Sequence, residues 1–158
     1  MEAALNRYHS HVGMQYGDGL KGLFIVEDPE DPYLNSYSVD DALLFSEWGT
    51  TSTYEGWTVN IRAPFEPNAL WPKTDMPAAL VNGVPSVDFD LQTTSGYVVE
   101  VEAGSAARLR LCYGGYNYRF HVRIEDHTMR VIAKDGTYVK PVEVQQLRVY
   151  GAERYDVL

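Results

Sequence analysis

Apolar and polar residues alternate along much of the chain, and this alternation predicts β-strands. The most regular stretch is 118–124, where Tyr118, Phe120, Val122 and Ile124 are separated by charged or polar residues. Side chains two residues apart leave the same face of a strand, so the pattern is typical of a strand with one buried face. Apolar runs or alternating patterns predict further strands at 23–26, 42–48, 79–82, 97–102, 107–113, 129–133, 142–149 and 155–158.

Turn residues separate these segments at short, regular intervals, which is typical of an all-β sandwich or barrel. Within 107–113 the two leucines are predicted to point to one face, and Arg108 and Arg110 to the other. Residues 27–35 contain two prolines and four acidic residues and are predicted to be an exposed linker. Residues 50–77 contain four prolines and are predicted to form a long connection with a short helix.

The composition supports a packed core and excludes some partners. Hydrophobic residues make up 45% of the 158 residues, and the formal net charge is −9. An acidic chain does not favour a phosphate-binding surface, so nucleic acid is not an expected partner. No apolar run approaches the roughly 18 residues that a membrane span requires. The first residues show no signal peptide, which leaves the cellular location open.

Two histidines, His9 and His11, lie one residue apart near the start of the chain. If the backbone there is extended, both imidazoles leave the same face. Neutral imidazole is a common ligand of copper, zinc and iron. The pair could therefore bind two neighbouring metals, one per ring, or a single metal coordinated by both rings. The alternative is an ordinary pair of polar strand residues.

The wider segment around these histidines resembles a signature of a known family. Residues 8–29 begin Tyr-His-Ser-His-Val-Gly, continue through Gln-Tyr-Gly-Asp-Gly-Leu-Lys-Gly, and end Leu-Phe-Ile-Val-Glu-Asp-Pro. This string is similar to the block that closes the first cupredoxin domain of multicopper oxidases, the family of laccases and ferroxidases. The resemblance implies that His9 and His11 bind the type 3 copper pair, one copper each, in the cluster that reduces dioxygen to water.

The second half of the chain also resembles this family. Its order of Leu-Val-Asn-Gly, a hairpin, Ile-Glu-Asp-His-Thr-Met-Arg-Val-Ile-Ala-Lys-Asp-Gly and a closing Gly-Ala-Glu-Arg-Tyr-Asp-Val-Leu is similar to a second cupredoxin domain. We therefore expect a cupredoxin-like Greek-key β-sandwich, truncated at both ends. Residues 1–33 would form the end of a first domain, and residues 34–158 most of a second, with an incomplete last strand.

Glu125 is a further candidate by resemblance. In the iron-oxidising branch of the family, the Ile-Glu-Asp-His segment contributes an acidic residue to the ferrous-iron site, and Glu125 occupies that position. A carboxylate is a hard ligand that suits iron. The alternative is a solvated acidic residue in a turn.

A blue-copper site built from Cys112, His121, His127 and Met129 is not expected. Such a site uses one Cys, two His and a weak axial Met. Here Cys112 falls within a predicted strand, and the next histidine is nine residues further on, across a Gly-Gly turn. Cys112 is instead predicted to be a small buried hydrophobic residue.

The resemblance implies a copper-binding fragment or truncated member of the family. The intact parent would be an oxidoreductase that takes electrons from a phenol or ferrous iron and passes them to dioxygen, which is reduced to water. The chain contains only 4 histidines and a single His-x-His element, whereas the family's copper cluster uses several. We therefore expect no catalytic residue in this chain by itself, and a need for a complementary chain or self-association. The alternative is a non-enzymatic cupredoxin-like binding module.

Overall fold

Strands dominate the computed structural model, which describes residues 4–49, 51–56, 78–85, 96–115 and 118–158. Helical structure within these ranges is limited to one turn at 53–56. None of the described helical residues could span a membrane. The strands are β1 (Ala4–His9), β2 (Lys21–Val26), β3 (Val39–Trp48), β4 (Ala78–Val81), β5 (Val84–Pro85), β6 (Ala107–Tyr113), β7 (Phe120–Val122), β8 (Met129–Lys134), β9 (Thr137–Val144), β10 (Leu147–Val149) and β11 (Arg154–Val157).

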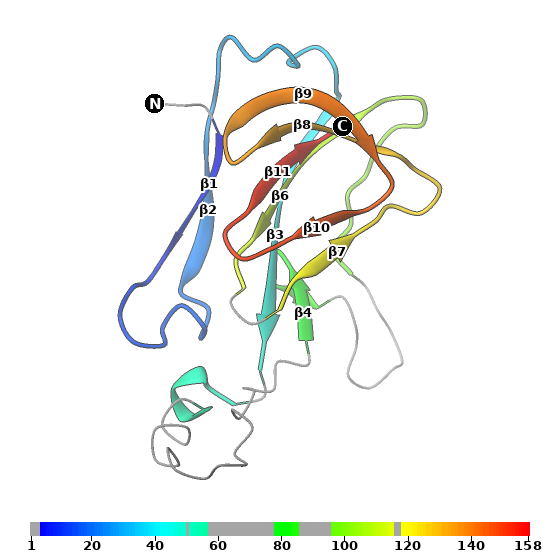
Figure 1. Cartoon of the computed structure of the whole chain (residues 1–158). Coiled ribbons are helices and arrows are strands. Elements are labelled where there is room, and N and C mark those ends of the chain that lie inside the picture. The colour runs from blue at the N-terminus through cyan, green and yellow to red at the C-terminus, as the bar shows by residue number, and fades with distance from the viewer. Residues whose placement is uncertain (1–3, 50, 57–77, 86–95, 116–117) are drawn as a thin grey trace.

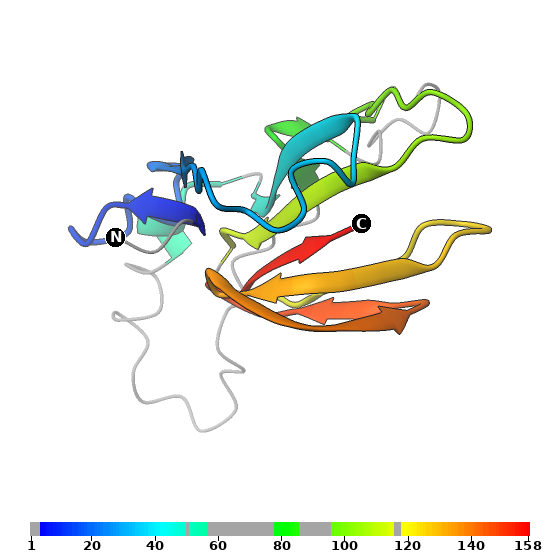
Figure 2. The same cartoon turned by 90° about the horizontal axis from the view of Figure 1, so that it is seen from above.

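Seven strands form one sheet in the order β5-β4-β3-β6-β11-β8-β9, and β7 and β10 form a separate antiparallel pair. The sheet curves, so that β3 and β6 lie in one layer and β8 and β9 in the layer facing it (Figure 2). Within the large sheet β3 and β6 run parallel and the other neighbours antiparallel. The all-β sandwich predicted from the alternation is confirmed.

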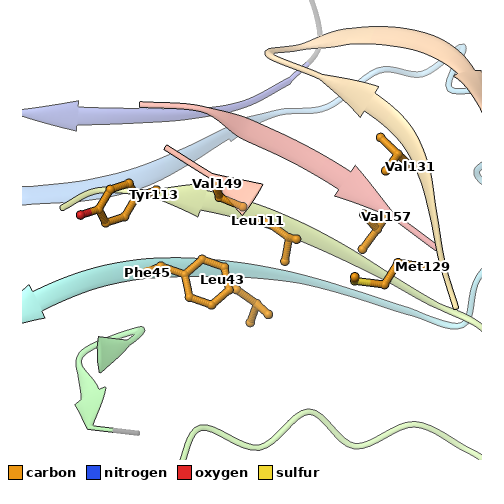
Figure 3. Close-up of a cluster of buried hydrophobic side chains, with 8 residues drawn as sticks. All are labelled: Leu43, Phe45, Leu111, Tyr113, Met129, Val131, Val149 and Val157. Atoms are coloured by element: carbon orange, nitrogen blue, oxygen red, sulfur yellow. The ribbon is translucent and has the colours of Figure 1, made fainter. Parts of the chain in front are cut away.

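The core lies between the two layers and draws side chains from five strands (Figure 3). Each fully buried aliphatic or aromatic side chain stabilises the fold by about 1.5–3 kcal/mol. Phe120 of β7 packs against the rings of Phe45 and Tyr113, with centroids 5.6 and 5.1 Å away. The buried members are Leu43, Phe45, Leu111, Tyr113, Met129, Val131, Val149 and Val157.

Strands β1 and β2 form a hairpin of their own beside the sandwich (Figure 1). Their register pairs Ala4 with Val26 and His9 with Lys21. The hairpin is attached at its base, where Leu5 is buried and its carbonyl accepts a hydrogen bond from the Arg154 guanidinium at 3.0 Å. The histidines lie at the opposite end of β1.

Two of the strand predictions are wrong. Residues 97–102 form no strand, because Tyr97 is anchored through its side chain: its hydroxyl donates to the Asp41 carboxylate at 2.9 Å. Residues 142–149 are divided between β9 and β10, and β10 pairs with β7 instead of continuing beside β8. Alternation shows which face is apolar but does not identify the backbone partner.

The prediction for 27–35 needs correction, and the face of β6 that carries its arginines is buried. Arg108 and Arg110 are 2% and 3% exposed, so both faces of β6 are covered. The Arg108 guanidinium forms ion pairs with Asp31 and Asp156, and Arg110 with Asp40. The carboxylate of Asp31 is therefore buried against the sandwich, although much of 27–35 is exposed. We call Arg108, Arg110, Asp31, Asp40 and Asp156 the Arg108 cluster.

The prediction for residues 50–77 can be compared only at its start. The turn at 53–56 is helical, and Thr53 is 1% exposed. The remainder of that stretch, 57–77, lies outside the described residues.

Candidate metal centre

His9 is the last residue of β1, and His11 lies two residues further on, in the loop 10–20 that leads into β2. Their ring centroids are 4.8 Å apart, and the rings are tilted by 32°. The two imidazoles therefore lie together, as the extended-backbone argument predicted. His9 is half-buried and His11 is exposed, so the pair opens toward solvent at the His11 side.

The hydrogen bonding of His9 leaves one ring nitrogen for a metal. Nδ1 of His9 lies 3.0 Å from the carbonyl oxygen of Ser10, which can only accept, so Nδ1 carries the proton. In the neutral ring Nε2 then holds the free lone pair. Histidine ligands of metals usually donate their other N–H to a carbonyl or carboxylate in this way. The arrangement fits a metal-binding imidazole.

The loop behind the histidines is held by a tight turn and by a buried anchor. Gly19 has φ +100, a conformation that side-chain-bearing residues rarely adopt. Thr53 donates from its backbone N–H and its hydroxyl to the Asp18 carboxylate at 2.6 and 2.7 Å. The Thr53 hydroxyl also lies 3.1 Å from the Met14 carbonyl. The loop is therefore docked on the helical turn at 53–56.

Tyr16 contacts the histidine pair from within this loop, and sequence reasoning did not single it out. Its ring centroid lies 4.6 Å from that of His9, and its hydroxyl donates to the Gly115 carbonyl at 2.6 Å. Arg7 and Lys21 place their cations 5.3 and 5.1 Å from the same ring centroid. The sequence pointed to only one of these neighbours. Arg7 precedes His9 by two residues, so an extended backbone puts both side chains on one face.

The described residues do not assemble a complete set of metal ligands. No group of three or more His, Cys, Asp or Glu side chains suited to a metal occurs among them. His127 bonds locally, with Nδ1 2.7 Å from the Glu125 carbonyl, and Nδ1 of His121 lies 2.6 Å from the Gln146 amide. The histidine pair thus offers two ring nitrogens, and the ligand role of His9 and His11 stays a prediction.

Cys112 is fully buried, which confirms that it is a small buried hydrophobic residue. Burial raises the pKa of its thiol to about 11. The absence of a blue-copper site around Cys112 stays a prediction.

Glu125 lies in the turn between β7 and β8 and is exposed. With Asp126 and His127 it lines an open pocket of about 390 Å³. This turn and the histidine pair lie on opposite sides of the sandwich (Figure 1). The structure therefore does not bring the two predicted sites together, and the ligand role of Glu125 stays a prediction.

A family model described as "Multicopper oxidase" matches residues 44–158, well over half of the chain. The chain belongs to the multicopper oxidases. Among curated multicopper oxidases, Laccase-1 of Pleurotus ostreatus is 35% identical over 148 residues, which cover 94% of this chain and 26% of that protein. Laccase of Phlebia radiata is 33% identical over 155 residues, covering 96% and 27%.

Solved multicopper oxidase structures share the fold. Fet3p, described as a multicopper oxidase that functions in iron import, superposes with a TM-score of 0.82 at 26% identity, covering 99% of this chain and 27% of Fet3p. The laccase of Botrytis aclada gives 0.76 at 29% identity, covering 99% and 28%. The cupredoxin-like Greek-key sandwich predicted from resemblance is confirmed. The chain spans only about a quarter of the length of these relatives.

Proposed function

We propose that His9 and His11 bind the type 3 copper pair of a multicopper oxidase, one copper per ring. The observation that carries this proposal is the pair itself: two imidazoles 4.8 Å apart, with Nδ1 of His9 tied to a carbonyl. The family is one of copper enzymes, and imidazole nitrogen suits copper. Bound copper would supply the electron-accepting chemistry through which such enzymes reduce dioxygen.

The role of this chain in that chemistry is to hold and orient two nitrogen ligands. The Ser10 carbonyl fixes the His9 tautomer, and the docked loop 10–20 sets where His11 projects. We infer that residues 1–33 are the closing part of a first cupredoxin-like domain and residues 34–158 a second. Their separation into a hairpin and a seven-stranded sheet supports this division.

The complete reaction is the oxidation of a phenol or of ferrous iron, coupled to the reduction of dioxygen to water. The relatives named as laccases support the first substrate, and the description of Fet3p as functioning in iron import supports the second. Glu125, with Asp126 beside it on the open pocket, would bind ferrous iron in the second case. Because the chain has 4 histidines, the other copper ligands come from residues outside this sequence. They would belong to further parts of a longer protein, to a complementary chain or to another copy of this chain.

The decisive experiment compares copper binding by two double variants. His9→Ala/His11→Ala removes the adjacent pair, whereas His121→Ala/His127→Ala removes the same number of imidazoles from the other end of the sandwich. Cu(II) binding is followed by calorimetry and electron paramagnetic resonance. We expect the first variant to lose the tightest site and the second to retain it. Equal binding by the two variants would refute the assignment.

Iron binding is tested separately at the β7–β8 turn. Glu125→Gln removes the charge of the proposed ligand with little change in shape, and Glu143→Gln on β9 is the exposed control. We expect only the first variant to weaken Fe(II) binding. A matched loss in both variants would show that the general negative charge, and not Glu125, attracts the cation.

A further inference from the structure

The ring of Tyr16 lies against the His9 ring of the histidine pair. Its centroid lies 4.6 Å from the His9 centroid, with the planes tilted by 42°. Aromatic rings attract one another at such separations and tilts, and one pair contributes about 0.5–1.5 kcal/mol beyond its buried area. The contact therefore restricts where the His9 imidazole can lie.

Tyr16 is itself fixed to the sandwich. Its hydroxyl donates to the carbonyl of Gly115, which is 99 residues away in the sequence and lies two residues after the end of β6 at Tyr113. Gly115 has no room for a side chain, because a Cβ there would collide with the Glu47 carboxylate and the Tyr113 ring. Both of those side chains are buried, so the carbonyl that Tyr16 binds has a well-defined position.

Two cations complete the surroundings of the ring. Arg7 comes from β1 and Lys21 from the first position of β2, directly opposite His9 in the hairpin register. Cations near the face of an aromatic ring are attracted to it. Burial raises the pKa of the Tyr16 hydroxyl, although Arg7 opposes this, so the group is a neutral phenol that can donate to Gly115.

We propose that Tyr16 is a positioning residue that holds the His9 imidazole in place for copper by linking it to the Gly115 carbonyl of the sandwich. This inference rests on the proposed function of His9 and His11. Tyr16 binds no metal in this proposal. It restricts the position of the His9 ring before a metal binds, because it connects that ring to the buried strands β3 and β6.

The first test reads the position of His9 without any metal. In nuclear magnetic resonance spectra of the full chain, the ring current of Tyr16 should displace the imidazole protons of His9 from the values of exposed histidines. We expect Tyr16→Leu to move these resonances to the exposed values, and Tyr16→Phe, which keeps the ring but loses the bond to Gly115, to move them part of the way. Tyr8→Leu is the matched control, because Tyr8 neighbours His9 on β1 but points to the other face.

The second test measures Cu(II) affinity of the same variants by calorimetry. Tyr16→Leu should weaken binding by about two- to tenfold, the range expected when one aromatic pair is lost. Tyr16→Phe, which lacks the hydroxyl bond to Gly115, should weaken binding less than Tyr16→Leu but measurably, and Tyr8→Leu should bind like the natural chain. Thermal unfolding of each variant shows whether any loss merely follows from lower stability.

Each result decides a different point. Unchanged His9 resonances in Tyr16→Leu would overturn the positioning role, and so would unchanged copper affinity in a variant whose resonances have moved. Copper binding that persists in His9→Ala/His11→Ala would refute the proposed function alone, because the metal-free spectra still decide whether Tyr16 positions His9.

Discussion

The histidine pair and the Arg108 cluster are held in opposite ways. His9 and His11 lie close because they are two residues apart on one hairpin, and at least one ring faces solvent. The Arg108 cluster joins β6 to β11, to β3 and to the segment before β3, and its two guanidinium groups are almost fully buried. The first can change without disturbing the fold, whereas the second holds several segments together.

This difference follows from the cost of burying charge. A buried ion loses its hydration and is tolerated only where partners and hydrogen bonds compensate. The Arg108 guanidinium donates Nε and Nη2 to Asp156 at 3.1 and 2.5 Å, and donates Nη1 to Asp31. Removing Arg108 would leave both carboxylates without the cation that they share. The half-exposed histidines carry no such penalty and are free to serve a ligand.

The largest expected effect is from Arg108→Ala. It leaves the buried Asp156 carboxylate without its main partner, and removing one member of a buried ion pair costs about 3–5 kcal/mol. Urea unfolding measures the change. Arg130→Ala, which removes an exposed pair with Glu143, is the control and should cost less than about 1 kcal/mol. Similar losses in both variants would mean that the Arg108 cluster stabilises the fold no more than an exposed ion pair does.

Asp31→Asn should follow, with a cost of about 1.5–3 kcal/mol, as for a hydrogen bond to a charged group. Burial by itself would raise the pKa of Asp31, but the Tyr33 backbone N–H and the Arg108 guanidinium lower it overall. A lowered pKa stabilises the fold at any pH above the unfolded-state pKa of about 3.9, and this contribution is lost as pH falls through the folded pKa. Denaturant unfolding between neutral pH and pH 2 should therefore show a shallower acid loss in Asp31→Asn.

The pH test has a clear contrary outcome. Burial raises the pKa of Asp156 despite Arg108. The contribution of Asp156 to the free energy of unfolding therefore has the opposite pH dependence and becomes more favourable as pH falls through its folded pKa. If Asp31→Asn loses stability in acid as steeply as the natural chain, the ion pair with Asp31 does not cause the acid sensitivity.

Gly115→Ala tests the connection between the loop that carries Tyr16 and the sandwich. It should cost about 1–3 kcal/mol, as for overpacking. The new methyl group collides with the Glu47 carboxylate and the Tyr113 ring, so the backbone must shift. The shift should also disturb the Tyr16 bond, and hence the His9 resonances. Gly96→Ala is the control, because a Cβ there meets no atom within 4 Å. Unaltered His9 resonances in a destabilised Gly115→Ala would show that the hairpin does not depend on this carbonyl.

The smallest effect on stability is expected from His9→Ala/His11→Ala, at about 0.5–1.5 kcal/mol, because His11 is exposed and the main loss is the ring contact between His9 and Tyr16. A cost above 2 kcal/mol in urea unfolding would show that the pair is structural, and the contrast with the Arg108 cluster would disappear.

The sequence by itself determined the features that depend on near neighbours. The alternation in 118–124 and 129–133 predicted strands because a period of two is local. His9 and His11 could be paired because two residues of extended backbone carry both rings to one side. The family signature around them was also contiguous, and the all-β fold followed from it.

Only the tertiary structure decided what distant segments do to one another. The sequence assigned Arg108 to one face of a strand but not to an ion pair, because Asp31 and Asp156 are 77 and 48 residues away along the chain. Tyr16 acquired a role only when Gly115 reached its hydroxyl. Alternation shows that a side chain leaves one face, but what covers that face depends on the packing of segments that no local pattern encodes.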